Sequence, residues 1–198
     1  MWNETFDTPD YVFGTEPAAF LRVHAGFLKP GLKGLALADG EGRNSVFMAG
    51  QGVETLAMDS APNALAKARA LAEARGVRVA HVEASITEWD WQPAAFDLVV
   101  AVFIQFLAPA ERAAVFAGMV RTLRPGGVLM LHGYRPEQLA YGTGGPRAEN
   151  QLYTEALLRE SFAALDILVL DSYDRDLAEG ARHRGPSALI DLIARKPA

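Results

Sequence analysis

A glycine-rich turn and an acidic residue downstream of it are the features of this sequence best suited to chemistry. The turn, ADGEGRN, contains Gly40 and Gly42, whose lack of side chains lets a ligand approach the backbone closely. Asp59 follows Gly40 by 19 residues (59 − 40), the spacing at which a doubly wound domain hydrogen-bonds ribose hydroxyls. Alone, the turn could be a tight strand-to-helix connection and Asp59 a helix cap beside Ser60. Together they favour a nucleoside-binding site.

Apolar runs alternate with helical patterns around these residues. Five runs are expected to be strands: residues 35–38, 53–58, 77–84, 96–104 and 127–134. Helices are expected after the glycine turn, over residues 63–75 and over residues 109–123, where apolar side chains recur on one helical face. This alternation indicates a parallel sheet that is covered by helices on both faces.

The alternation ends after residue 134. A connection rich in glycine, YGTGGP, leads to one more expected helix over residues 154–162. Two apolar runs follow, over residues 165–170 and 187–194, and we expect them to pair antiparallel because no helical pattern separates them. The sequence therefore predicts an α/β fold with a doubly wound, seven-stranded sheet that is mostly parallel and has an antiparallel edge strand.

Length and composition are those of an ordinary globular chain. The 198 residues are expected to form a single domain, residues 1–198, in which residues 1–30 make an N-terminal arm and a cap helix. Because 24 acidic residues outnumber 19 basic ones and no basic block occurs, a nucleic-acid or membrane-surface partner is not expected. A small molecule is the expected partner, and the oligomeric state is left open.

The sequence contains no cysteine, which excludes disulfides, thiolate nucleophiles and iron–sulfur clusters. Its four histidines are never three or four residues apart, the spacing that places two ligands on one helical face, so no metal site is predicted. The first ten residues lack the basic and apolar layout of a signal peptide, and the longest apolar run, Leu98–Ile104, is too short to span a membrane. These features predict a cytoplasmic protein.

Four segments resemble the class I S-adenosylmethionine-dependent methyltransferases: ALADGEGRN, AMDSAPNALAKA, FDLVVAVFIQFL and LRPGGVLML. Within that family, four motifs resemble the branch that includes tellurite-resistance and thiopurine-type methyltransferases: DYVFGTEP, ADGEGRN, YGTGGP and EGARHRG. The resemblance implies S-adenosylmethionine as the cofactor and a strand order of 3-2-1-4-5-7-6. It also implies that the cofactor lies across the carboxyl ends of the first four strands.

The resemblance implies a set of cofactor-binding residues: Ala38, Asp39, Gly40, Asp59, Ser60, Ser85, Ile86, Phe103 and Ile104. The turn would face the methionine end, Asp59 the ribose, Ser85 the adenine and Phe103 the sulfonium. The family pattern D-x-G-x-G-x-G is altered, because Ala36 and Ala38 stand where the acid and the first glycine are usual. Ser85 likewise replaces the acid that often reads the adenine amino group.

Methyl transfer requires an in-line approach in a dry site, so positioning dominates and no catalytic residue is predicted. The residues expected to bind the acceptor are Tyr11, Phe13, Gln105, Tyr134, Arg135, His183 and Arg184. Guanidinium groups at Arg135 and Arg184 would suit an anionic acceptor, although solvated surface positions are the other interpretation.

The sequence thus predicts a methyltransferase that acts on a small anionic or soft-nucleophile acceptor. Two alternatives stay open. The changes at Ala36 and Ala38 would also fit a non-catalytic protein that binds a nucleoside or S-adenosylmethionine. A nicotinamide-dependent oxidoreductase is less well supported, because no tyrosine is followed four residues later by lysine and the third glycine of that fingerprint is missing.

Overall fold

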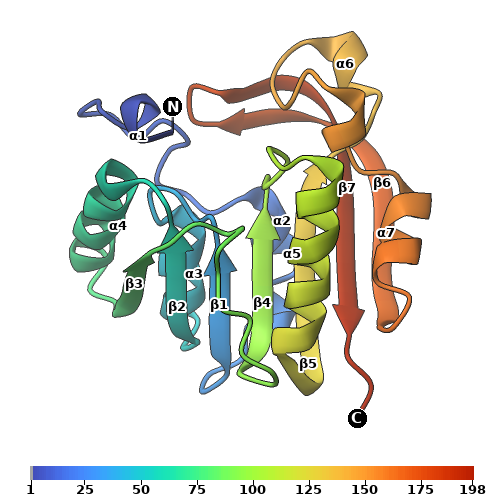
Figure 1. The fold of residues 1–198 in the computed structure, drawn as a ribbon. Helices are drawn as coiled ribbons and strands as arrows, with labels where there is room; N and C mark the ends of the chain where they lie inside the picture. Colours follow the sequence, from blue (N-terminus) through green and yellow to red (C-terminus); the bar gives the residue numbers. More distant parts are fainter. Residues whose placement is uncertain (1) are drawn as a thin grey trace.

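The computed structural model describes residues 2–198, which contain one seven-stranded sheet with the order β3-β2-β1-β4-β5-β7-β6 (Figure 1). The strands are β1 (Lys33–Leu37), β2 (Glu54–Asp59), β3 (Val79–Glu83), β4 (Phe96–Val102), β5 (Leu123–Tyr134), β6 (Asp166–Glu179) and β7 (His183–Arg195). Strands β1 to β5 pair parallel, whereas β7 pairs antiparallel with both β5 and β6. The predicted fold class and strand order are confirmed.

Helices cover both faces of the sheet, as the alternation in the sequence predicts. The α-helices are α1 (Trp2–Thr5), α2 (Ala19–Val23), α3 (Arg43–Gly50), α4 (Pro62–Ala74), α5 (Pro109–Thr122), α6 (Gln138–Tyr141) and α7 (Glu155–Ser161). Two 3-10 helices are η1 (Ala25–Phe27) and η2 (Glu149–Gln151). Within residues 2–198, no helix has the length and apolar character needed to cross a membrane.

Strand β4 shows why the central strands are apolar throughout. Val99 and Ala101 lie in the core cluster that includes residues of α5 and α7, while Leu98 and Val100 lie in the cluster that includes residues of α2 and α3. Successive side chains of a strand point to opposite faces, so a strand covered on both sides needs apolar residues at every position. This strand ends at the middle of the sheet edge where the candidate site lies.

The hairpin of β6 and β7 is longer than the sequence predicts. The expected strands, 165–170 and 187–194, extend to Glu179 and back to His183, so that only residues 180–182 connect them. The extension of β6 is mostly polar, as is usual for an edge strand, and it is held by backbone pairing with β7 and by Tyr173 and Leu177, which pack in a cluster with Tyr134 and Leu189. Figure 1 shows this hairpin bending over the carboxyl-end edge of the sheet towards α1.

The turn after β1 keeps the path of a glycine-rich turn although it contains an alanine. Ala38 has a φ of 44°, in the left-handed region, and Gly40 and Gly42 follow with φ values of 61° and 89°. A Cβ on Gly42 would lie 2.8 Å from Ala68 of α4, so this glycine permits close packing of the turn on that helix. The change from glycine to Ala38 has therefore left the course of the backbone intact.

Candidate functional site

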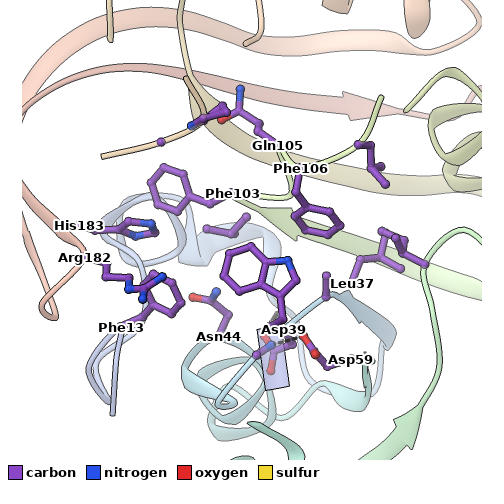
Figure 2. Close-up of a pocket in the computed structure, with 18 of the residues that line it drawn as sticks. Phe13, Leu37, Asp39, Asn44, Asp59, Phe103, Gln105, Phe106, Arg182 and His183 are labelled. Atoms are coloured by element: carbon purple, nitrogen blue, oxygen red, sulfur yellow. Dashed lines mark hydrogen bonds between the residues drawn. The ribbon is translucent and has the colours of Figure 1, made fainter. Parts of the chain in front are cut away.

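A cavity of about 970 Å³ lies at the edge of the sheet where β1, β2 and β4 end. The N-terminal arm, residues 142–146 and the turn between β6 and β7 complete its walls. Figure 2 shows the carboxyl groups of Asp39 and Asp59 on one side of the cavity and the rings of Phe13, Phe103 and His183 on the other. We call these the acidic end, formed by Asp39, Asp59, Ser60 and Ser85, and the aromatic end, formed by Phe13, Phe103, Tyr134 and His183.

Asp59 joins the ends of two strands at the acidic end. One of its carboxylate oxygens accepts a hydrogen bond from the Gly40 N–H at 2.8 Å, and the other accepts one from the Ala61 N–H at 2.9 Å. Burial raises the pKa of Asp59, and both hydrogen bonds oppose that rise. The residue is therefore a cap of its own turn and also a support for the glycine turn, and it still lines the cavity.

Asp39 is a second carboxyl group at this end. Its Oδ1 accepts a hydrogen bond from the Ser45 N–H at 3.2 Å, whereas Oδ2 is shielded from solvent and has no hydrogen-bond partner. Burial raises the pKa of Asp39 to about 7. Among residues 2–198, no group of three or more histidine and carboxylate side chains is placed to hold a metal ion.

Most of the predicted cofactor residues line the cavity: Ala38, Asp39, Gly40, Asp59, Ser60, Ser85, Ile86 and Phe103. Ile104 does not, because its side chain is buried in the core cluster that includes residues of α5. Trp2 and Phe106 line the acidic end instead, with their rings 5.9 Å apart, and neither was predicted to bind the cofactor.

Three segments close over the aromatic end: residues 12–14, residues 142–146 and residues 180–183. We call these three segments together the roof. The Ala181 N–H donates to the Val12 carbonyl at 2.9 Å, and any Cβ on Gly180 would overlap the backbone of Phe13. A Cβ on Gly145 would lie 2.7 Å from the Tyr134 ring. The motifs DYVFGTEP, YGTGGP and EGARHRG therefore meet here because their glycines permit these close contacts.

Phe103 is the centre of the aromatic end. Its φ of 57° is rare for a bulky side chain and signals backbone strain of the kind found at functional sites. The centroid of its ring lies 4.2 Å from that of His183 and 4.7 Å from that of Tyr134. The Tyr134 hydroxyl and His183 Nδ1 are both shielded from solvent and lack a hydrogen-bond partner.

Both of these polar groups are neutral at physiological pH. Burial, together with the positive charge of Arg43, lowers the pKa of His183 to about 3. Burial likewise raises the pKa of the Tyr134 hydroxyl. The aromatic end therefore offers hydrogen bonds from uncharged groups, set between aromatic walls.

A comparison with known families finds a match for the part of the chain that contains the acidic end. Residues 35–127 match the family described as a methyltransferase domain. This segment, a little less than half of the chain, is therefore similar to that family. The matched segment runs from β1 into β5 and includes the glycine turn, Asp59 and Phe103.

Curated relatives match a little over half of this chain. An uncharacterised methyltransferase of Synechocystis is 29% identical over 105 residues, which are 52% of this chain and 48% of that protein. The chain spans about half the length of the curated relatives that it matches.

Two solved structures match nearly the whole chain. TehB from Haemophilus influenzae has a TM-score of 0.73 at 17% identity, over 98% of this chain and 65% of that chain. The N-methyltransferase NodS from Bradyrhizobium japonicum, in complex with S-adenosylhomocysteine, has a TM-score of 0.73 at 16% identity, over 100% and 97%. These likenesses confirm the fold of the class I methyltransferases, while membership of the narrower branch stays a prediction.

Four of the residues predicted to bind the acceptor line the cavity: Phe13, Gln105, Tyr134 and His183. Gln105 is already engaged, because its amide nitrogen donates to the Tyr134 carbonyl at 2.8 Å and its amide oxygen accepts from the Tyr134 N–H. Tyr11 lies outside the wall, where its hydroxyl donates to the Lys67 carbonyl at 3.0 Å. Tyr11 therefore does not line this cavity.

The two arginines predicted to bind the acceptor do not line this cavity either. Arg135 forms ion pairs with Asp174 and Glu137, away from the cavity wall. Arg184 lies on β7 beside His183, and since side chains alternate along a strand, His183 points inward and Arg184 remains exposed. Arg182, in the hairpin turn, lines the cavity instead (Figure 2).

The side chains of the glycine turn hold the neighbouring segments in place. Glu41 accepts hydrogen bonds from the Lys67 ammonium at 2.8 Å and from the Phe13 N–H at 3.3 Å. Asn44 accepts one from the Ala18 N–H at 3.0 Å. The sequence analysis missed these two residues because their partners are far away in the chain.

Arg43, which follows the same turn, forms a buried ion pair with Glu179 at 2.8 Å. Glu179 also accepts a hydrogen bond from the Ala19 N–H at 2.9 Å, and it lies directly before the hairpin turn that carries Arg182. The turn therefore connects to the roof on two sides, and its backbone remains available to a ligand.

We expect Glu179→Gln to destabilise the protein by about 3–5 kcal/mol at pH 7, because it leaves the Arg43 charge buried without a partner. Burial by itself would raise the pKa of Glu179. The Arg43 charge and the hydrogen bonds from Ala19 and Arg43 outweigh burial and lower the pKa below its ordinary value of 4.5. The stabilisation is therefore present above pH 4.5 and is lost as the pH falls through the lowered pKa. Urea unfolding of parent and variant at pH 7 and below pH 4.5 measures this difference, which should shrink in acid.

The matched control is Glu16→Gln, which removes the exposed ion pair between Glu16 and Arg75. Exposed pairs contribute at most about 1 kcal/mol, so this variant should resemble the parent. An equal loss of unfolding free energy in the two variants would show that the Arg43–Glu179 pair stabilises the protein no more than an exposed ion pair does.

Proposed function

We propose that this protein transfers the methyl group of S-adenosylmethionine to a small anionic or soft-nucleophile acceptor. The observation that carries the proposal is the division of one cavity into two unlike ends. The acidic end has the glycine turn and Asp59 in the register of a nucleoside site, and the aromatic end is a separate compartment closed by the roof. The match of residues 35–127 to the methyltransferase domain family supports the same conclusion.

The residues of the acidic end fit the proposed cofactor. Each Asp59 oxygen accepts one hydrogen bond from the protein, and a carboxylate oxygen has room for a second, so Asp59 can also accept from ribose hydroxyls. Ser85 and Ile86 line the cavity beyond Asp59, where an adenine would lie. The likeness to NodS, whose structure contains S-adenosylhomocysteine, is further support.

The chain contributes positioning more than acid–base chemistry. The sulfonium of the cofactor supplies the methyl group, and the acceptor has to approach it in line and away from water. Phe103, Tyr134 and His183 form walls that exclude water beside the place of transfer. His183, with a pKa of about 3, is a weak base, so an acceptor that reacts as an anion or through a soft lone pair suits this site.

A positive charge in the wall of the cavity supports an anionic acceptor. Arg182 lines the wall, and within residues 2–198 no ion pair engages it. We therefore assign to Arg182 the role that the sequence analysis gave to Arg135 and Arg184. The non-catalytic alternative is weakened by Ala38, whose left-handed backbone keeps the glycine-turn path, and turnover with any acceptor would exclude it.

We predict that S-adenosylhomocysteine binds the protein and that Asp59→Ala weakens binding about ten- to a hundredfold, the usual effect of losing hydrogen bonds to a charged group. Isothermal titration calorimetry measures both affinities. Asp97→Ala is the control, because Asp97 is a similar carboxylate that bonds to the Lys33 N–H, at the start of β1, and to Arg124. Equal affinity of Asp59→Ala and the parent would show that Asp59 is only a cap.

We predict that a panel of thiols, selenite, tellurite, carboxylates and amines, assayed with S-adenosylmethionine, shows turnover of anionic or soft acceptors. Arg182→Ala should raise the KM of an anionic acceptor about three- to tenfold, because a partly solvated charge attracts an anion modestly. Arg184→Ala is the matched control and should leave KM unchanged. A preference for cationic acceptors, or equal effects of the two variants, would contradict this assignment.

A further inference from the structure

Gln105 is a buried polar side chain of the cavity wall whose hydrogen bonds the proposed function does not use. Its amide nitrogen donates to the Tyr134 carbonyl at 2.8 Å and to the Gln151 carbonyl at 3.2 Å. Its amide oxygen accepts from the Tyr134 N–H. Because both donors of the amide are engaged, Gln105 is suited to holding the neighbouring backbone and not to binding a ligand.

The amide of Gln105 takes the place of a strand residue at the edge of the sheet. Strand β4 ends at Val102, which pairs with His132. Strand β5 continues to Tyr134, which pairs with Leu189 of β7 on its other side. A side-chain amide has the donor and the acceptor of a peptide group, so it can bond to the backbone of Tyr134 where β4 no longer does.

Gly133 provides the space for this amide. A Cβ on Gly133 would lie 2.5 Å from Gln105 Oε1 and 2.9 Å from the Tyr153 ring, too close for any other residue to be accommodated without displacing its neighbours. The glycine and the glutamine are therefore matched to each other at the end of β5.

The three residues that follow β4 are each fixed by a different contact. The Phe103 N–H donates to the His132 carbonyl at 2.9 Å, and the Ile104 side chain is buried in the core cluster that includes residues of α5. Gln105 then bonds to Tyr134. The strained φ of Phe103, 57°, persists only if its surroundings impose it. Phe103 lies between two of these contacts, so it cannot relax without breaking one of them.

The imposed conformation places the Phe103 ring in the cavity, where Figure 2 shows it beside His183. Its centroid lies 4.2 Å from that of His183, 4.7 Å from that of Tyr134 and 4.6 Å from that of His132. The ring is thus held by its own backbone and by its aromatic neighbours, yet it remains half-exposed to the cavity. A group fixed in this way is pre-organised for a ligand.

We propose that Gln105 is a positioning residue that holds the Phe103 ring beside the sulfonium of S-adenosylmethionine. The inference rests on the proposed function and deepens it. An aromatic ring attracts a cation, most strongly where water is excluded. The sulfur of S-adenosylhomocysteine is uncharged, so the ring should favour S-adenosylmethionine over S-adenosylhomocysteine, and that preference should depend on Gln105.

The test measures the affinities for S-adenosylmethionine and S-adenosylhomocysteine by isothermal titration calorimetry, without an acceptor. The parent should prefer S-adenosylmethionine, and Gln105→Leu should reduce that preference about three- to tenfold, the effect of weakening a cation–π contact. Leucine is close to glutamine in size but cannot bond to Tyr134. Should it prevent folding, Gln105→Asn, whose amide is one methylene shorter, is the second variant and carries the same expectation.

A double-mutant cycle shows whether Gln105 acts through Phe103. Phe103→Ala should reduce the preference at least as much as Gln105→Leu does, and the two changes together should reduce it no further than Phe103→Ala alone.

Thr122→Val is the matched control. The Thr122 hydroxyl also donates to a backbone carbonyl, that of Gln92 at 2.8 Å, but it lies next to the amino end of β5 and outside the cavity wall. The variant loses a buried hydrogen bond, so it should lower the unfolding temperature and leave the ligand preference unchanged.

The outcomes separate this inference from the proposed function. Failure of the parent to bind either ligand would overturn both. Binding of both ligands without a preference in the parent, or with an undiminished preference in Gln105→Leu, would keep the proposed cofactor and overturn the positioning role. A further loss when Gln105→Leu is added to Phe103→Ala would also overturn it, because Gln105 would then act apart from the ring. An equal loss of preference in Thr122→Val would overturn it as well, because reduced stability would be the cause.

Discussion

The turn after β1 serves both ends of the cavity, and the rest of the site depends on how it does so. Its backbone takes the left-handed path of Ala38, Gly40 and Gly42, which brings main-chain groups to the edge of the sheet. Asp59 fixes that path from the neighbouring strand through the Gly40 N–H. Because the backbone does this, the side chains of the same short segment are free to hold the arm and the hairpin over the aromatic end.

This arrangement links the acidic end to the aromatic end, although the residues of the two ends lie far apart in the sequence. Glu41 reaches the arm at Phe13, and Arg43 reaches the hairpin at Glu179. Displacement of the turn would therefore displace the roof, and with it His183. The two ends nevertheless differ in electrostatics. The acidic end carries buried carboxyl groups, whereas the aromatic end holds neutral polar groups, one of which, His183, has its pKa lowered by the Arg43 charge.

Sequence alone was sufficient for the fold, because the alternation of apolar strands and amphipathic helices reports the burial of each element, and the family resemblance supplied the strand order. The register of Gly40 and Asp59 was also readable, since both lie within one strand–helix–strand unit. The directions of Arg135 and Arg184 were not. They depend on where the β6–β7 hairpin begins and ends, and the part of β6 that extends to Glu179 is mostly polar, with Tyr173 and Leu177 too far apart to form an apolar run. The roles of Arg43 and Glu179 were missed because 136 residues separate them.

We infer that a ligand bound at the acidic end stabilises the glycine turn and, through the turn, the roof. Hydrogen–deuterium exchange with and without saturating S-adenosylhomocysteine tests this claim most directly. We predict slower exchange in residues 38–45 and 59–61 on binding, accompanied by slower exchange in the roof at residues 12–14 and 180–183. Unchanged exchange in residues 38–45 and 59–61, or slower exchange there without slower exchange in residues 12–14 and 180–183, would contradict the account.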